Sequence, residues 1–94
     1  MAKLDGEIAF VTGATAGFGA ALTRLFIAEG ARVIASGRRS DRLEKLQSEL
    51  GDKCLTVTLD VRDRDAVQTA VSGLPKDFAD ITILINNAGL ALGK

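Results

Sequence analysis

The sequence contains no histidine, tyrosine or tryptophan, and its only aromatic residues are four phenylalanines. With no histidine and a single cysteine, Cys54, it offers neither a ligand set for a metal ion nor an internal disulfide bond. We therefore predict no metal site. We also predict a cytoplasmic protein in which Cys54 is a small buried residue at the start of a strand, because free thiols are typical of reducing compartments.

Excess charge of either sign is also absent, since 12 basic residues balance 12 acidic ones. A neutral chain has no overall field that would draw it to nucleic acid or to an anionic membrane, so neither is predicted as a partner. The first apolar run is interrupted by Gly13, Gly17 and Gly19, which argues against a signal peptide and a membrane span. Ninety-four residues suffice for one domain with a small core.

The most informative stretch is Thr12-Gly13-Ala14-Thr15-Ala16-Gly17-Phe18-Gly19, between an apolar run and a helical pattern. Backbone N–H groups at a helix N-terminus bind phosphate when no side chain blocks the approach. Gly13 would permit a tight turn out of the strand. Gly17 and Gly19 would let the backbone come close to a pyrophosphate and let the helix pack on the sheet. A Walker-type loop is excluded because Ala20 and Ala21 follow. An ordinary strand-to-helix turn is the alternative.

Apolar patterns along the rest of the chain predict alternating strands and helices. Strands are expected at Ile8–Val11, Arg32–Ser36, Cys54–Leu59 and Ile81–Ile85. Helices are expected from Phe18 to Gly30 with apolar Phe18, Leu22, Leu25 and Phe26, from an N-cap at Ser40 to Gly51 with Asp41 in the first turn, and from an N-cap at Asp63 to before Pro75. This order predicts an α/β fold, a partial doubly wound parallel sheet of Rossmann-like type with strand order 3-2-1-4.

Three motifs together resemble the short-chain dehydrogenase/reductase family. They are TGATAGFG at 12–19, Asp60-Val61 after the third strand, and Asn86-Asn87-Ala88-Gly89 after the fourth. The resemblance covers nearly the whole chain but only the amino-terminal part of a family member. The tail 90–93 and the segment GRRSDRLEKL also resemble the branch that oxidises serine and 3-hydroxy acids with NADP.

The resemblance implies a role for each matching residue. The pyrophosphate turn would be Thr12, Gly13, Gly17, Phe18 and Gly19, with the N–H groups of the last two as donors. Asp60 would accept a hydrogen bond from the adenine amino group, and the Val61 N–H would face the adenine ring. Asn87, Ala88 and Gly89 would run beside the riboses. For Asn86 and Asn87, side-chain hydrogen bonds that tie neighbouring strands are an equally weighted alternative.

The end of the second strand predicts which coenzyme binds. An NAD site places an acidic residue there to bond the ribose 2′-hydroxyl, whereas an NADP site needs an arginine for the 2′-phosphate. This chain has Ser36-Gly37-Arg38-Arg39 at that place. We predict that NADP(H) binds. Arg38 would be the main partner of its 2′-phosphate and Arg39 a secondary one, and Gly37 would leave room for that phosphate. A solvated basic turn beside Asp41 is the alternative.

The family's chemistry uses a tyrosine, a lysine four residues later and a serine. Because the sequence has no tyrosine, we assign no catalytic residue and expect no hydride transfer by this chain alone. The resemblance implies that residues 1–94 are one NADP-binding half domain, truncated before the catalytic segment. Three interpretations stay open: a dehydrogenase fragment, a stand-alone nucleotide-binding module, and a structural or engineered half-fold.

The fourth strand is expected to lie at an uncovered edge of the sheet, because the sequence contains no later strand to pair with it. Residues 81–85 are almost wholly apolar and form an open edge in the predicted sheet. Open apolar edges pair readily with other chains. We therefore expect self-association through this strand and the apolar faces of the first and third helices, with an edge-to-edge dimer forming one continuous sheet.

Overall fold

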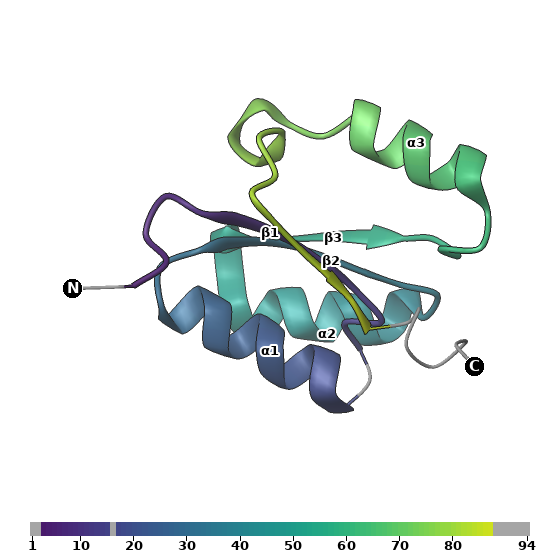
Figure 1. Cartoon of the computed structure of the whole chain (residues 1–94). Coiled ribbons are helices and arrows are strands. Elements are labelled where there is room, and N and C mark those ends of the chain that lie inside the picture. The colour runs from purple at the N-terminus through teal and green to yellow at the C-terminus, as the bar shows by residue number, and fades with distance from the viewer. Residues whose placement is uncertain (1–2, 16, 88–94) are drawn as a thin grey trace.

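A computed structural model describes residues 3–15 and 17–87 of the chain. Strands and helices alternate through this part of the chain, which confirms the predicted pattern (Figure 1). In chain order the elements are β1 (Ile8–Thr12), α1 (Gly17–Ala28), β2 (Arg32–Gly37), α2 (Ser40–Leu50), η1 (Gly51–Lys53), β3 (Cys54–Thr58), α3 (Arg64–Ser72), η2 (Lys76–Phe78) and β4 (Ile83–Asn86).

The described strands form one four-stranded parallel sheet in the order β3-β2-β1-β4. This order confirms the doubly wound arrangement. In the centre of the sheet, Phe10 of β1 lies opposite Ile34 of β2 and Leu84 of β4. The order reverses between β1 and β4, so Gly13 and Asn87, which follow these two strands, lie at the switch point where such sheets bind ligands.

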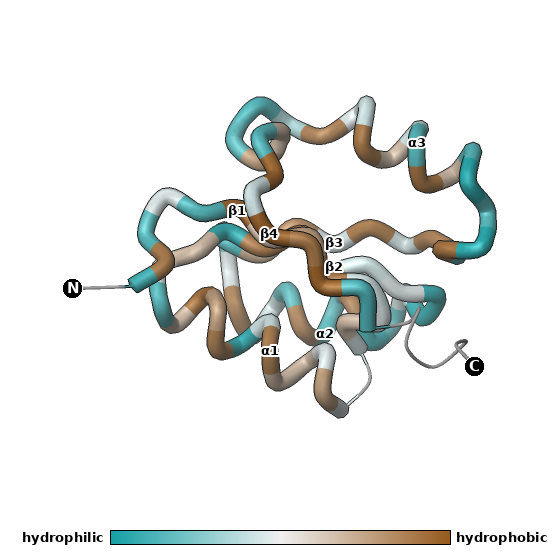
Figure 2. The backbone as a smooth tube through the Cα atoms, viewed as in Figure 1, coloured by the Kyte–Doolittle hydropathy of each residue, from teal (hydrophilic) through white to brown (hydrophobic). Residues whose placement is uncertain are grey.

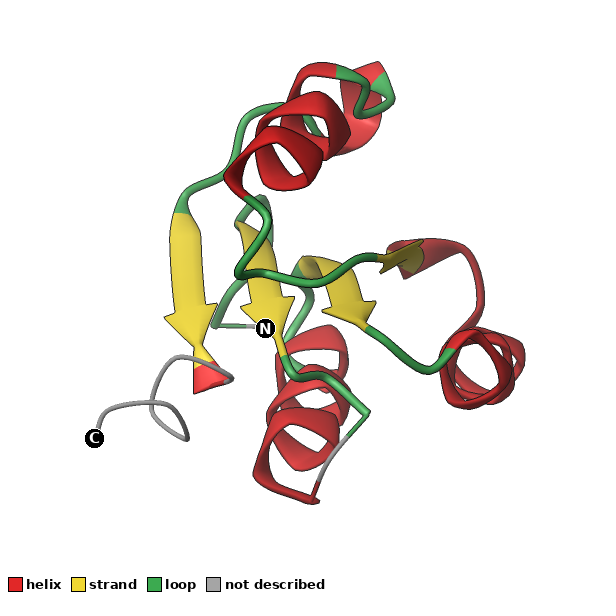
Figure 3. Cartoon of the chain, turned by 90° about the vertical axis from the view of Figure 1, so that its right-hand side faces the viewer, coloured by secondary structure: helices red, strands yellow, loops and turns green. Residues whose placement is uncertain are grey.

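Two apolar cores hold the sheet between its helices. Helices α1 and α2 cover one face, and α3 covers the other (Figures 1 and 3). Side chains of a strand point alternately to the two faces, so β1 and β2 supply both cores. The first core contains Ala9, Val11, Ala14, Val33, Ala35, Leu43, Leu46 and Cys54, and the second contains Ile8, Phe10, Ile34, Leu59 and Phe78.

Helix α1 packs on the sheet through small residues. Its buried positions are Gly19 and Thr23, and the Thr23 hydroxyl donates a hydrogen bond to the Gly19 carbonyl at 2.9 Å. Phe18 and Leu25, which belong to the predicted apolar pattern, are 65% and 52% exposed. The pattern located the helix correctly, and Phe26 of that pattern packs against the first core, but the prediction is wrong for Phe18 and Leu25. Close approach of the helix backbone to the sheet requires small side chains at the contact rather than large apolar ones.

The helix caps agree with the sequence analysis at one helix and differ at another. The Asp63 carboxylate accepts a hydrogen bond from the Ala66 N–H at 3.1 Å, as expected of the N-cap of α3. The prediction of Ser40 as an N-cap is wrong. Arg39 holds the cap position of α2 without a side-chain cap bond, since Ser40 is already helical. Gly51 ends α2 with φ of 81°, as expected for a glycine stop.

Strand β4 lies at the edge of the sheet. It begins two residues later than predicted, after Thr82, whose hydroxyl accepts a hydrogen bond from the Ile8 N–H at 3.0 Å. Its apolar run is typical of a strand buried on both faces, but Leu84 is 69% exposed, so burial on both faces is not observed. Figure 2 shows the hydrophobic run of β4 along the outside of the sheet.

Cys54 is the first residue of β3 and is buried in the first core. Burial raises the pKa of its thiol to about 11, so the thiol stays protonated at neutral pH. This confirms the prediction of a packing role. None of the helices in residues 3–15 and 17–87 is long and apolar enough to cross a membrane.

Candidate functional site

The loop after β1 forms the centre of the site. Gly13 adopts a φ of 63°, a conformation that side-chain-bearing residues rarely take, and so permits the tight turn expected there. The Ala14 N–H then donates to the Ser36 carbonyl at 3.0 Å, which ties the loop to the end of β2. The turn is thus held against the sheet before α1 begins.

The two glycines at the start of α1 have different surroundings. A Cβ atom built on Gly19 would overlap the Gly13 carbonyl and come within 3.0 Å of the Asn87 amide nitrogen. A Cβ atom on Gly17 would meet no atom within 4 Å among the described residues. Gly19 is therefore required by packing, whereas Gly17 leaves open space beside the first turn of the helix. Open space at a helix N-terminus is what a phosphate needs in order to approach the N–H groups.

The asparagines after β4 reach across to the glycine loop. The Asn87 side-chain amide donates to the Gly13 carbonyl at 3.2 Å, and the Thr12 hydroxyl donates to the Asn86 side-chain oxygen at 3.1 Å. These bonds join the carboxyl ends of β1 and β4, so the structural alternative for both asparagines is observed. Ala88 and Gly89, which complete the predicted motif, lie outside the described residues.

The end of β2 presents small residues followed by two arginines. Ser36 is fully buried and its hydroxyl donates to the Val11 carbonyl at 3.1 Å, while the Cβ position of Gly37 lies 3.5 Å from the Thr15 side chain. Arg38 and Arg39 are exposed. Arg39 lies 3.9 Å from an Asp41 carboxylate oxygen, a long and exposed pairing. Among the described residues no ion pair involves Arg38, so its guanidinium is available to an anion.

The turn after β3 brings Asp60 to the same end of the sheet. Thr58 of β3 lies opposite Gly37, and the Leu59 N–H donates to the Gly37 carbonyl at 2.8 Å. Asp60 therefore follows β3 where Arg38 follows β2. The side-chain hydrogen bond from Arg62 is the main cause that lowers the pKa of Asp60 to about 2, with smaller contributions from the Arg62 backbone N–H and the charge of Arg38.

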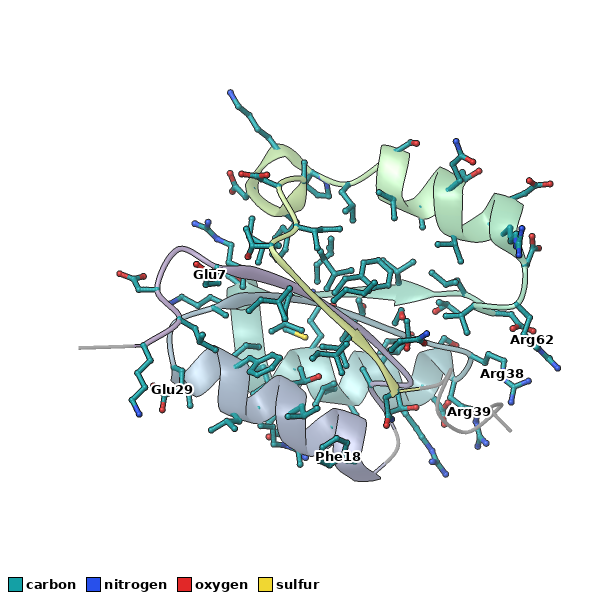
Figure 4. All side chains as sticks on the ribbon, viewed as in Figure 1. Glu7, Phe18, Glu29, Arg38, Arg39 and Arg62 are labelled. Atoms are coloured by element: carbon teal, nitrogen blue, oxygen red, sulfur yellow. The ribbon has the colours of Figure 1, made fainter. Side chains whose placement is uncertain are left out.

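Figure 4 shows Arg38, Arg39 and Arg62 at one end of the molecule, where β2 and β3 end. The sequence analysis missed Arg62 because its bond to Asp60 depends on the conformation of the turn. It also missed Ser36 as a support for the loop. The sequence signal for Ser36 was a hydroxyl residue at the end of an apolar strand, because a buried hydroxyl there needs a hydrogen-bond partner.

A groove of about 700 Å³ lies between α3 and the sheet edge at β4. Its apolar lining includes Phe10, Val61, Val67, Val71 and Leu84. Of the predicted site residues, Thr12 and Val61 line this groove. It adjoins the exposed edge of β4 and therefore belongs to the surface at which self-association was expected.

The structure thus brings the predicted site residues that it describes to the carboxyl ends of the strands. The glycine loop and Asn87 are joined by a direct bond, and Arg38 and Asp60 follow neighbouring strands. Backbone donors at a helix start, a cationic strand end and an adjacent carboxylate are groups suited to a nucleotide with phosphates.

The model of the family described as short chain dehydrogenase matches residues 7–94, and the chain belongs to this family. Over 86 residues it is 55% identical to the NADP-dependent 3-hydroxy acid dehydrogenase YdfG of Escherichia coli K12, covering 92% of this chain and 35% of that protein. Over 90 residues it is 53% identical to serine 3-dehydrogenase of Agrobacterium fabrum, covering 96% of this chain and 36% of that protein.

Solved structures agree with these sequence comparisons. The closed form of serine dehydrogenase complexed with NADP⁺ matches with a TM-score of 0.80 and 51% identity, over 82% of this chain and 31% of that one. The crystal structure of serine dehydrogenase from Escherichia coli matches with the same TM-score and identity, over 82% of this chain and 36% of that one. The chain spans about a third of the length of the relatives it matches.

Proposed function

We propose that this chain is the coenzyme-binding portion of an NADP-dependent short-chain oxidoreductase that acts on a hydroxyl or carbonyl substrate. Arg38 carries the proposal, because it stands exposed at the end of β2, where an NAD site would have a carboxylate. The same coenzyme is supported by the similarity to an NADP-dependent dehydrogenase and to a dehydrogenase structure that contains NADP⁺. Bound NADP(H) would supply or accept the hydride. Serine or a 3-hydroxy acid is the substrate class that we propose for the whole protein.

The proposed coenzyme contacts follow the surface from β4 to β3. Thr12, Gly13, Gly17, Phe18 and Gly19 bind the pyrophosphate, and Asn87, Ala88 and Gly89 run beside the riboses. Gly37 gives the 2′-phosphate room, with Arg38 as its main partner and Arg39 as its secondary one. Asp60 and Val61 bind the adenine. The open space at Gly17 supports this assignment, since a side chain there would occupy the approach to the α1 N-terminus.

We further propose that the chain alone does not catalyse hydride transfer, because it has no tyrosine to act as proton donor or acceptor. A matching carboxy-terminal portion that carries this chemistry should restore turnover when mixed with the chain. NADPH oxidation by the pure chain above background would contradict the proposal. Localisation in the cytoplasm stays a prediction.

Coenzyme binding is tested by titrating the purified chain with NADPH and NADH at one salt concentration. The chain has no tryptophan or tyrosine, so the emission of the dihydronicotinamide can be followed without interference from the protein. We expect NADPH to bind at least about tenfold more tightly, and Arg38→Ala to remove the preference. Arg32→Ala is the matched control because Arg32 is exposed at the opposite end of β2. A folded chain that binds neither coenzyme would overturn the proposal.

A second candidate function is self-association through β4. The exposure of Leu84 at the sheet edge favours it, because an uncovered apolar strand is a template for pairing with another chain. We propose a dimer joined edge to edge at β4, with the apolar surfaces of α1 and α3 beside it. Sedimentation velocity at micromolar concentration should show a dimer that Leu84→Lys dissociates. Gln68→Lys, at an exposed position of α3, should leave the dimer intact.

A further inference from the structure

The Asp60 carboxylate is held by Arg62 through both of its oxygens. Asp60 Oδ1 accepts from the Arg62 backbone N–H at 3.0 Å and from Arg62 Nε at 3.1 Å. Asp60 Oδ2 accepts from Arg62 Nη2 at 2.8 Å. The planar guanidinium and the backbone donor together fix the orientation of the carboxylate as well as its charge.

These bonds leave the carboxylate little capacity to accept another donor. Each carboxylate oxygen accepts about two hydrogen bonds, so Oδ1 is fully used and Oδ2 retains a single acceptor position. A ligand that meets Asp60 must therefore present one N–H or O–H to Oδ2. The carboxylate stays accessible enough for this contact, since the Asp60 side chain is 38% exposed.

Arg38 acts on the same carboxylate from the neighbouring strand end. Its charge contributes to keeping Asp60 ionised, although it does so less than Arg62. The carboxylate is thus flanked by two cations that follow β2 and β3. Only Arg62 bonds it directly among the described residues, so Arg62 decides where the remaining acceptor position points.

We propose that Arg62 is a positioning residue that aims the remaining acceptor of Asp60 Oδ2 at the 6-amino group of the bound purine and thereby selects 6-aminopurine over 6-oxopurine dinucleotides. The inference rests on the proposed NADP(H) site. A 6-oxo group presents lone pairs to the fixed carboxylate and is repelled, whereas an amino group donates to it. A carboxylate free to rotate could turn away from the 6-oxo group, so selection depends on the Arg62 bonds.

The test compares binding of NADPH with binding of reduced nicotinamide hypoxanthine dinucleotide phosphate, which differs at the purine C6 substituent. Both carry the fluorescent dihydronicotinamide, so one titration serves for both. We expect the wild-type chain to bind NADPH at least about tenfold more tightly, and Arg62→Ala to reduce this ratio below about threefold. Arg64→Ala removes the same charge two residues away, where no hydrogen bond to Asp60 is observed, and should keep the wild-type ratio.

Arg62→Lys separates positioning from charge. Lysine keeps the cation but cannot hold both carboxylate oxygens in a planar fork. The preference of Arg62→Lys for NADPH over the hypoxanthine dinucleotide should therefore also fall below that of the wild type. A wild-type ratio retained in either Arg62 variant would overturn the inference while leaving the NADP(H) site intact. Equal binding of the two dinucleotides by the wild-type chain would also overturn the inference and leave the NADP(H) site intact. If the folded wild-type chain binds neither dinucleotide, the proposed function fails and the inference fails with it.

Discussion

The side-chain amide of Asn87 donates a hydrogen bond to the backbone carbonyl of Gly13 at 3.2 Å. Asn87 follows the edge strand β4, and Gly13 begins the loop after the central strand β1. The bond therefore fixes the glycine loop from the side of the switch point at which these two strands separate. Because Gly13 is the residue with positive φ in this turn, Asn87 holds the turn where its shape is decided.

Asn87→Ala should weaken both the fold and the site. Removing the amide leaves the Gly13 carbonyl without this donor, which should lower the free energy of unfolding by about 1 kcal/mol. NADPH affinity should fall as well, because the loop loses its anchor. Thr82→Val is the matched control, since it removes hydrogen bonds to Ile8 at the other end of the same strand pair. It should lower stability similarly and leave coenzyme affinity unchanged. Equal losses of affinity in both variants would contradict the prediction.

The two glycines of α1 should respond differently to alanine. Gly19→Ala places a methyl group against the Gly13 carbonyl and the Asn87 amide, so it should destabilise the chain by ~1–3 kcal/mol. Gly17→Ala meets open space and should maintain stability or raise it by up to ~1 kcal/mol, since alanine favours the helix. It should nevertheless weaken NADPH binding. Urea unfolding followed by circular dichroism and coenzyme titration measure the two effects; unchanged affinity in Gly17→Ala would remove this glycine from the site.

The order of the strands could be predicted from the sequence because it depends on features that are visible locally. Short apolar runs such as the one in β2, bounded by Gly30 and Gly37, alternate with segments of helical period. Parallel strands joined by right-handed crossovers then leave few possible topologies. The glycine loop and the asparagines Asn86 and Asn87 fall at the strand ends for the same reason, so most of the described candidate site could also be placed.

The remaining features depend on distances that periodicity does not encode. Thr23 rather than Leu25 faces the sheet, because the separation of α1 from β1 decides which side chains fit. The bonds between Asp60 and Arg62 need the conformation of a turn, and the exposure of Leu84 depends on what covers the edge. Hydrophobicity along the chain contains no information about any of these three relationships.

Asp63 should stabilise α3 more than Ser40 stabilises α2. Asp63→Ala removes the bond to the Ala66 N–H and should cost about 1 kcal/mol of unfolding free energy. Ser40 makes no cap bond, so Ser40→Ala should stay within about 0.5 kcal/mol of the wild type. Urea unfolding followed by circular dichroism compares the two variants with the wild type. A larger loss in Ser40→Ala would show that Ser40 caps α2 in solution.

The Asp60–Arg62 pair should contribute to stability over only part of the pH range. The pKa of Asp60 falls from an ordinary 3.8 to about 2 in the folded chain, chiefly through the side-chain hydrogen bond from Arg62. A carboxyl whose folded pKa is lowered stabilises the fold above its unfolded pKa, and this contribution disappears as pH falls through the folded value. The stability difference between wild type and Arg62→Ala should therefore be constant above about pH 5 and vanish towards pH 2.

Carboxyl carbon chemical shifts measure the same effect directly. The Asp60 signal of the wild type should titrate with a midpoint near pH 2, and Arg62→Ala should move that midpoint upward, towards the ordinary range. Arg38→Ala should move it in the same direction by a smaller amount, because Arg38 acts through its charge alone. The order of these two shifts is the decisive observation. If Arg38→Ala moves the midpoint more than Arg62→Ala does, the carboxylate in solution faces Arg38 rather than the turn that contains Arg62.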